Sequence, residues 1–219
     1  MKRNSAILFG GSGLTGNFLL DYLTKDSNFD SITVVSRKKI KLQHKKLQNK
    51  VINFSNTKEI ENCITKNSIV FSCIGTTNAK VNGDKIKYKK VDFDITINIA
   101  KSCKKKNAKK FLFISSAGSN SLSSNFYLKL KGEIEESVIE IYNSSLFIFK
   151  PSLLLGSRKD IRIIEKIGQV VMSLFSFLLP KKIKAINSSL VAKAMLDFSI
   201  SNLNGVYIIE NKEIINHFK

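Results

Sequence analysis

Three polar residues in the middle of the chain, Ser116, Tyr127 and Lys131, could together move a proton to or from a carbonyl or alcohol oxygen. Tyr127 and Lys131 are four residues apart, so they share one face of a helix. An ammonium group beside a phenol stabilises the phenolate and helps the phenol exchange a proton near neutral pH. The hydroxyl of Ser116 would hold the reacting oxygen, with Ser115 as second choice. We therefore predict that Ser116, Tyr127 and Lys131 are catalytic.

The same pair has a simpler interpretation as a surface Tyr beside a Lys. A Tyr and a Lys at this spacing occur easily by chance in a chain with 36 Lys and Arg. The position of the pair favours the catalytic interpretation. It lies on the helix expected after the fifth strand, where a site at the carboxyl ends of the strands would form.

A glycine-rich loop follows the first apolar run, with Gly10, Gly13 and Gly16 at three-residue intervals in GGSGLTG. In a strand–turn–helix unit one glycine allows the tight turn, one lets the backbone approach a pyrophosphate, and one lets the helix pack on the strand. The helix N-terminus then presents N–H groups to the phosphates. A glycine-rich turn without a ligand is the alternative. The loop predicts a dinucleotide site.

Two cations, Arg37 and Lys38, follow the second apolar run, with no acidic residue nearby. A carboxylate at this place would bind the ribose 2′-hydroxyl of NAD, whereas a cation accommodates the 2′-phosphate of NADP. We expect Arg37 and Lys38 to contact the 2′-phosphate and NADP(H) to be preferred over NAD(H). Another stretch of Lys-rich surface is the alternative.

Short apolar runs alternate with longer amphipathic stretches and predict the elements that must position these residues. Continuous apolar runs suit strands covered on both faces, and strand–helix alternation implies a parallel sheet. The expected fold is α/β, a Rossmann-like doubly wound parallel sheet with a small C-terminal cap on the substrate side. We expect a single domain over 1–219, with a dinucleotide-binding core at 1–150 and the substrate-side part at 151–219. The expected strands are 5–9, 31–36, 50–54, 68–74, 111–115, 145–149 and 206–210, and the helices are 14–25, 57–65, 86–105, 126–142 and 188–200.

The net charge of +19 suggests a polyanion partner, but all except four of the cations are Lys and they are scattered along the chain. Specific DNA readers favour Arg, so we expect solvated surface charge and no specific nucleic acid. Three cysteines and two histidines show no metal-ligand spacing, and we expect no metal and a cytoplasmic protein.

The apolar stretch 161–179 is the longest in the chain. Its most apolar part, 170–179, is about ten residues long, whereas a membrane span needs roughly 20, so no transmembrane segment is expected. We interpret it as a lid helix over the pocket of a small-molecule substrate. A homodimer surface in place of a monomer, or a peripheral membrane contact beside the basic residues at 181–184, is the alternative.

These motifs resemble the short-chain dehydrogenase/reductase superfamily, in its atypical NAD(P)H-binding branch. The segments GGSGLTG, SRKK, SCIGTT, VDFD, SSAG, SSNFYLKLKGEIE and FKPSLLLGSR are similar to the Tat-interacting oxidoreductase-like family. The resemblance implies cofactor contacts along the whole dinucleotide. They are Ser12, Gly13, Leu14 and Thr15 at the pyrophosphate, Arg37 and Lys38 at the 2′-phosphate, Ile74 and Gly75 at the adenine ribose or its linker, Tyr127 and Lys131 at the nicotinamide ribose, and Leu154 and Arg162 near the nicotinamide.

Two residues depart from the family pattern. Asn53 stands where relatives carry an Asp facing adenine, and Asp92 stands where extended members carry an Asn that supports the active-site Lys through water. The second departure bears on proton relay. The function expected is NADPH-dependent oxidation or reduction of a small alcohol or carbonyl. The alternatives are an NADPH-binding regulator or assembly protein without catalysis, and a nucleotide-sugar epimerase or dehydratase, which usually devotes a larger C-terminal domain to its substrate.

Overall fold

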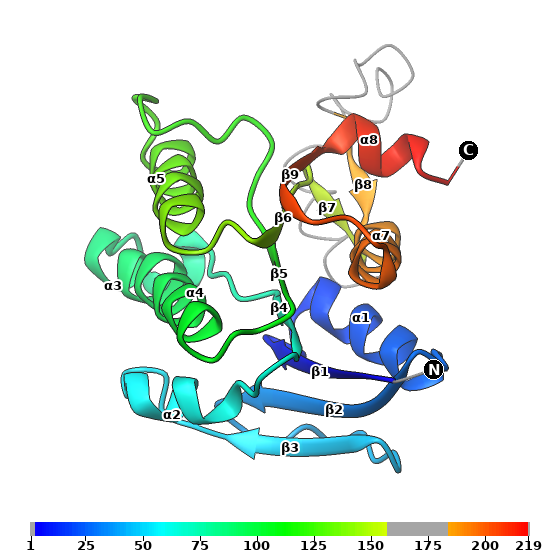
Figure 1. Cartoon of the computed structure of the whole chain (residues 1–219). Helices are drawn as coiled ribbons and strands as arrows, with labels where there is room; N and C mark the ends of the chain where they lie inside the picture. The colour runs from blue at the N-terminus through cyan, green and yellow to red at the C-terminus, as the bar shows by residue number, and fades with distance from the viewer. Residues whose placement is uncertain (1–2, 157–183, 219) are drawn as a thin grey trace.

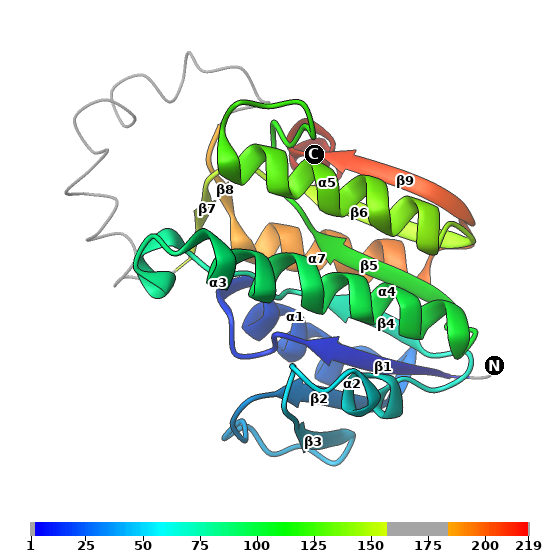
Figure 2. The ribbon, with the colours of Figure 1, turned by 90° about the vertical axis from the view of Figure 1, so that its left-hand side faces the viewer.

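The computed structural model describes residues 3–156 and 184–218. Its main sheet is made of β1 Asn4–Phe9, β2 Phe29–Ser36, β3 Leu47–Val51, β4 Ile69–Ser72, β5 Lys110–Ile114, β6 Ser145–Lys150 and β9 Gly205–Glu210. All neighbouring strands are parallel, in the order β3-β2-β1-β4-β5-β6-β9. The carboxyl ends of the strands therefore meet at one edge, to which the arrows point in Figure 2. The order reverses between β1 and β4, so a ligand crevice is expected there.

Helices cover both faces of the sheet (Figure 1). On one face lie α2 Thr57–Cys63, α4 Ile95–Lys105 and α5 Phe126–Ile141, and on the other lie α1 Leu14–Lys25 and α7 Ser188–Ile200. The remaining elements are short: the 3-10 helix Asn78–Val81, α3 Lys85–Lys89, the π-helical turn Lys90–Asp94, the strands β7 Leu154–Leu155 and β8 Ile186–Asn187, and α8 Asn211–Asn216. The α/β Rossmann-like fold expected from the sequence is thereby confirmed.

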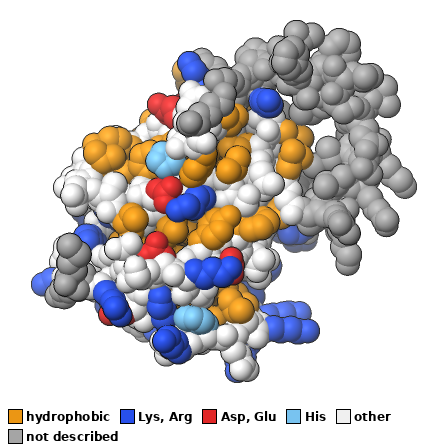
Figure 3. All heavy atoms as spheres, turned by 90° about the vertical axis from the view of Figure 1, so that its right-hand side faces the viewer, with side chains coloured by type: hydrophobic (Ala, Val, Ile, Leu, Met, Phe, Trp, Pro, Cys, Tyr) orange, Lys and Arg blue, Asp and Glu red, His pale blue; other side chains and the backbone are white. Residues whose placement is uncertain are grey.

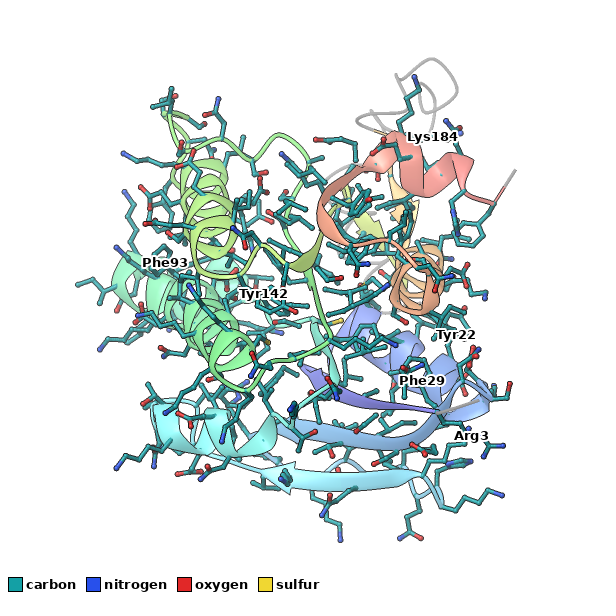
Figure 4. The ribbon with its side chains drawn as sticks, viewed as in Figure 1. Arg3, Tyr22, Phe29, Phe93, Tyr142 and Lys184 are labelled. Atoms are coloured by element: carbon teal, nitrogen blue, oxygen red, sulfur yellow. The ribbon has the colours of Figure 1, made fainter. Side chains whose placement is uncertain are left out.

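Each face of the sheet has its own apolar core. In β5, Phe111 and Phe113 point to the α2/α4/α5 side, and Leu112 points to the α1/α7 side. Successive side chains of a strand point to opposite faces, so a strand buried on both must be apolar throughout. Figure 4 labels one residue of each core, Tyr142 near α5 and Phe29 near α1. The Tyr142 hydroxyl donates a hydrogen bond to the Ala108 carbonyl at 2.8 Å.

The third strand is shifted from its expected place. It runs over Leu47–Val51, whereas the apolar residues of KVINF favoured 50–54. Its ladder with β2 pairs Ile32 with Leu47 and ends at Ser36 and Val51, because β2 stops there. An edge strand with both faces half-exposed needs no apolar run, so the sequence pattern did not mark its start.

The single helix expected over 86–105 is divided into α3, the π-helical turn and α4. The π-helical turn has Asp92 at its centre, and the carbonyl of Asp92 accepts a hydrogen bond from the Thr96 hydroxyl at 2.7 Å. A π-turn adds one residue to a helix turn and is often found at functional sites. One added residue hardly changes the average spacing of apolar residues, so the sequence pattern predicted a continuous helix.

The C-terminal elements that were expected to form one cap belong partly to the main sheet and its helical layer and partly to a separate strand pair. The helix expected over 188–200 is α7, which packs beside α1, and β9 pairs with β6 as the last strand of the main sheet. The pair β7–β8 lies at the carboxyl edge of the sheet. The stretch 161–179 and Arg162 lie outside the described residues. Within 3–156 and 184–218, no helix combines the length and apolarity needed to cross a membrane.

Candidate NAD(P)H site

The glycine loop between β1 and α1 is as tight as its sequence predicts. Gly10 has a φ of 83°, a conformation that favours glycine, and a Cβ atom there would lie 2.7 Å from the carbonyl carbon of Cys73. A Cβ atom on Gly16 would overlap the carbonyl oxygen of Gly10. The Gly13 N–H donates to that oxygen at 2.9 Å and closes the turn. Side chains at Gly10 and Gly16 would therefore prevent this loop.

The N-terminus of α1 is free of side-chain caps. Its N-cap residue is Gly13, whereas α2, α5 and α7 begin at asparagines whose side chains accept from the first-turn N–H groups. The buried hydroxyl of Thr15, in the first turn, has no hydrogen-bond partner among the described residues. Uncapped N–H groups and the helix dipole suit a phosphate ligand.

A cavity of about 630 Å³ opens beside this loop, at the reversal point of the strand order. Its wall comes from the ends of β1, β2 and β4, the segment after β3, and the π-helical turn. Six of the predicted cofactor residues line it: Gly10, Ser12, Gly13, Arg37, Ile74 and Gly75. Leu14, Thr15 and Gly16 form the adjacent first turn of α1. Lys38 lines a neighbouring cleft together with Ser12 and Arg37.

The charges around the cavity favour an anion. Arg37, Lys80 and Lys90 line it, against the single carboxylate of Asp94 among its described lining. Asn53 also lines the cavity, and its side-chain oxygen accepts from the Ser55 N–H at 3.0 Å. Sequence reasoning missed Lys80 and Lys90, because no pattern separates them from the other lysines. A pyrophosphate-containing dinucleotide fits this cavity in both charge and backbone geometry.

Tyr127 and Lys131 lie on one face of α5, as predicted. The Asn125 side chain caps this helix by accepting from the N–H groups of Tyr127 and Leu128 at 3.0 and 3.1 Å. Lys131 is buried, and its Nζ lies 5.9 Å from the ring centre of Tyr127. The Tyr127 side chain is exposed. The structure therefore brings a buried ammonium beside an accessible phenol.

A second tyrosine, Tyr88, packs edge-on against Tyr127 with ring centres 6.2 Å apart. Its hydroxyl donates to the Thr76 carbonyl at 3.0 Å. Burial, followed by the nearby Asp92 carboxylate, raises the pKa of Tyr88 far above its usual value. Tyr88 thus stays protonated and structural, and Tyr127 is the exposed member of the two packed tyrosines.

Asp92 connects Lys131 to the cofactor cavity. Its Oδ2 forms a buried ion pair with Lys131 Nζ at 2.7 Å, and its Oδ1 accepts from the Thr76 N–H at 2.7 Å. Thr76 follows Gly75, which lines the cavity. The departure from Asn to Asp noted in the sequence therefore gives Lys131 a direct charged partner.

Ser115 and Ser116 follow β5 but have different surroundings. The buried Ser115 hydroxyl donates to the carboxylate of Glu135 in α5. The Ser116 hydroxyl is half-buried and has a 3.3 Å contact with the carbonyl of Ala117 in its own loop. The Ser115 hydroxyl is thereby engaged by α5, whereas the Ser116 hydroxyl contacts its own loop. Leu154, in β7, is half-buried against the α1/α7 core.

The sheet order, glycine loop and cavity define a dinucleotide-binding protein of the Rossmann class. A family model described as NAD(P)H-binding matches residues 10–143. Protein HTATIP2 of Rattus norvegicus is 30% identical over 99% of this chain and 90% of its own length. A mitochondrial FMP52 protein of Candida albicans is 28% identical over 92% of this chain and 90% of its own length. The chain belongs to this NAD(P)H-binding, HTATIP2/FMP52-like family of atypical short-chain dehydrogenases/reductases.

Solved structures agree on the fold. A UDP-N-acetylglucosamine 4-epimerase from Methanobrevibacter ruminantium superposes with a TM-score of 0.71 at 20% identity, covering 96% of this chain and 77% of its own. A UDP-glucose 4-epimerase from Thermus thermophilus, solved with NAD, gives 0.68 at 16% identity, covering 97% and 81%. At these identities the likeness concerns the fold alone.

Proposed function

We propose that this protein is an NADPH-dependent oxidoreductase of a small carbonyl or alcohol. The observation that carries the proposal is the juxtaposition on α5 of the exposed Tyr127 phenol and the buried Lys131 ammonium. Such a pair suits proton exchange with a substrate oxygen. Such a pair could also contact the nicotinamide ribose, but binding alone does not need a phenol that exchanges protons.

Each residue has a distinct role in the proposed reaction. The cofactor, when bound, would supply the hydride as NADPH if a carbonyl is reduced, or accept it as NADP⁺ if an alcohol is oxidised. Tyr127 gives a proton to the carbonyl oxygen, or takes one from an alcohol. Lys131 stabilises the phenolate that remains, and Ser116 holds the reacting oxygen by a hydrogen bond. Residues 151–219 contribute the substrate side in this proposal.

A comparison of two tyrosine variants tests the proposal. NADPH oxidation is followed over a panel of aldehydes and ketones for the wild type, Tyr127→Phe and Tyr22→Phe. Tyr22 lies on α1, across the sheet from α5, and serves as the matched control (Figure 4). Tyr127→Phe should lose at least about a hundredfold in kcat, the usual contribution of a general acid–base group. Equal activities of the three proteins would refute the role of Tyr127.

The preference for NADPH is a second part of the proposal. Arg37 lines both the cavity and the neighbouring cleft, where Lys38 joins it. A guanidinium binds phosphate with two hydrogen bonds, so Arg37→Ala should weaken NADPH binding about tenfold or more and leave NADH binding nearly unchanged. Lys45→Ala, in the same basic loop, is the control. A parallel loss for NADPH and NADH would contradict the preference.

One observation favours an NADPH-binding regulator instead. The charge of Lys131 is met by Asp92, which weakens the help it gives to the phenol. The same panel distinguishes the two functions. Tight NADPH binding with no turnover on any carbonyl, and no effect of Tyr127→Phe, would establish the regulator.

We also propose a cytoplasmic location, because the three cysteines are free thiols and free thiols suit a reducing compartment. Relatives named as mitochondrial make the mitochondrion the alternative. Cell fractionation with an antibody against the chain would decide between them.

A further inference from the structure

A second carboxylate, Glu135, lies on the same face of α5 as Tyr127 and Lys131, one turn beyond Lys131. Its side chain is 9% exposed and is surrounded by polar partners. One oxygen, Oε1, accepts from the hydroxyls of both Ser115 and Ser119. The other, Oε2, lies 3.3 Å from Lys150 Nζ at the end of β6. The proposed reaction uses none of these contacts.

The two serines bracket the loop that carries Ser116. Ser115 begins this loop at the end of β5, and Ser119 ends its first turn, with its N–H donating to the Ser116 carbonyl at 3.1 Å. A single carboxylate oxygen therefore fastens the loop on both sides of Ser116. Because Glu135 and Tyr127 belong to one rigid helix, the same contact fixes the loop relative to the phenol.

The loop is also pressed against α5 one and two turns before Glu135. The Asn120 N–H donates to the Leu128 carbonyl at 3.0 Å. A Cβ atom on Gly132 would overlap the backbone of Ser121. Glycine at 132 thus allows the close approach that brings the loop within reach of Glu135.

We propose that Glu135 is a positioning residue that fixes the loop of Ser116 relative to Tyr127, an inference that rests on the proposed function. The geometry requires a carboxylate. Glutamine has one acceptor oxygen, and if this oxygen met the two serines, its NH₂ group would face the Lys150 ammonium, donor against donor. If the amide turned over, the serine hydroxyls would lose their acceptor.

The test uses Glu135→Gln, with Glu136→Gln as a matched control. Glu136 is the next residue on the same helix, is exposed, and accepts from Ser121 of the same loop. Three quantities are measured: hydrogen exchange of the Ala117 and Ser119 amides with NADPH bound, the dissociation constant of NADPH, and kcat and KM on the best carbonyl of the panel.

For Glu135→Gln we expect loop amides that exchange about tenfold faster or more, because hydrogen bonds to a charged group are lost. We expect kcat to fall about a hundredfold, the effect of misplacing a positioned group, with the NADPH dissociation constant unchanged. Glu136→Gln should resemble the wild type in all three. Normal loop exchange and normal kcat in Glu135→Gln would overturn the proposal.

Two further variants separate positioning from simple charge pairing. In Glu135→Gln/Lys150→Met the ammonium that would face the new amide, and that also lies 3.5 Å from Glu210 Oε1, is removed, and the loop should stay mobile. Recovery of slow exchange and kcat would assign the effect to Lys150 and overturn the proposal. Ser115→Ala/Ser119→Ala keeps the ion pair but removes both hydroxyls, so it should loosen the loop. This variant tests the proposal independently if Glu135→Gln does not fold. A wild type that binds NADPH without turnover would refute the proposed function, while the exchange data would still decide whether Glu135 holds the loop.

Discussion

Replacing Asp92 by an asparagine should destabilise the protein through the stranded charge of Lys131. The new amide would keep an oxygen for the Thr76 N–H, which now donates to Asp92 Oδ1 at 2.7 Å. What the substitution removes is the negative charge paired with Lys131 Nζ at 2.7 Å. The side chains of the pair are 1% and 8% exposed, so water cannot replace the lost partner.

The magnitude follows from this burial. Removing one partner of a buried ion pair costs about 3–5 kcal/mol. Because the Thr76 hydrogen bond is retained, we expect the lower end, about 3 kcal/mol. For a chain of this size each kcal/mol lowers Tm by about 2–4 °C, so Tm should fall by about 6–12 °C.

The chain offers a matched control in Asp21 and Lys25. Their ion pair has the same 2.7 Å distance, but the side chains are 49% and 72% exposed. Exposed pairs contribute about 0.2–1 kcal/mol, so Asp21→Asn should have a small effect. The two distances are equal, so the comparison tests the effect of burial on the value of the ion pair.

Urea unfolding followed by circular dichroism measures the free energies for Asp92→Asn, Asp21→Asn and Asp92→Asn/Lys131→Met. The double variant should recover much of the loss, because it buries no unpaired charge. Equal losses in Asp92→Asn and Asp21→Asn, or no recovery in the double variant, would refute the reasoning.

Gly16→Ala should abolish NADPH binding in a fluorescence titration, because its Cβ would overlap the Gly10 carbonyl and deform the phosphate loop. Gly132→Ala should lower the free energy of unfolding despite the better helix propensity of Ala, since Cβ would overlap the backbone of Ser121; a gain of about 1 kcal/mol would show that the loop is free to move. Burial lowers the pKa of Lys110 from 10.5 to about 8. Between pH 8 and pH 10.5 the unfolded chain therefore binds more protons than the folded protein, and the free energy of unfolding should rise with pH. Urea unfolding at pH 8 and pH 10 should show this rise in the wild type relative to Lys110→Met, and parallel curves would contradict it.

The charge of +19, the most unusual figure in the composition, carries little of the proposed function. Figure 3 shows Lys and Arg side chains spread among apolar and acidic ones on the face formed by α1, α7 and α8. The cations that matter to the proposal are Arg37 and Lys38, at the cavity and its neighbouring cleft, and Lys131 on α5, and position rather than number distinguishes them.

Local rules made much of the fold predictable. The alternation of apolar runs and amphipathic stretches located six of the main strands to within a few residues, because buried parallel strands must be apolar on both faces. β3 was misplaced because an edge strand takes its register from the backbone of β2. The π-helical turn was missed because an inserted residue leaves the helical period almost unchanged.

The sequence by itself determined the glycine loop and the Tyr127–Lys131 spacing, since a turn of fixed φ and a helix of fixed pitch depend only on neighbouring residues. The tertiary structure alone decided that Asp92 pairs with Lys131 and that Glu135 fastens the loop of Ser116. These contacts join segments brought together by the crossovers of the sheet. No local pattern distinguishes the carboxylates that are buried there from those that face water.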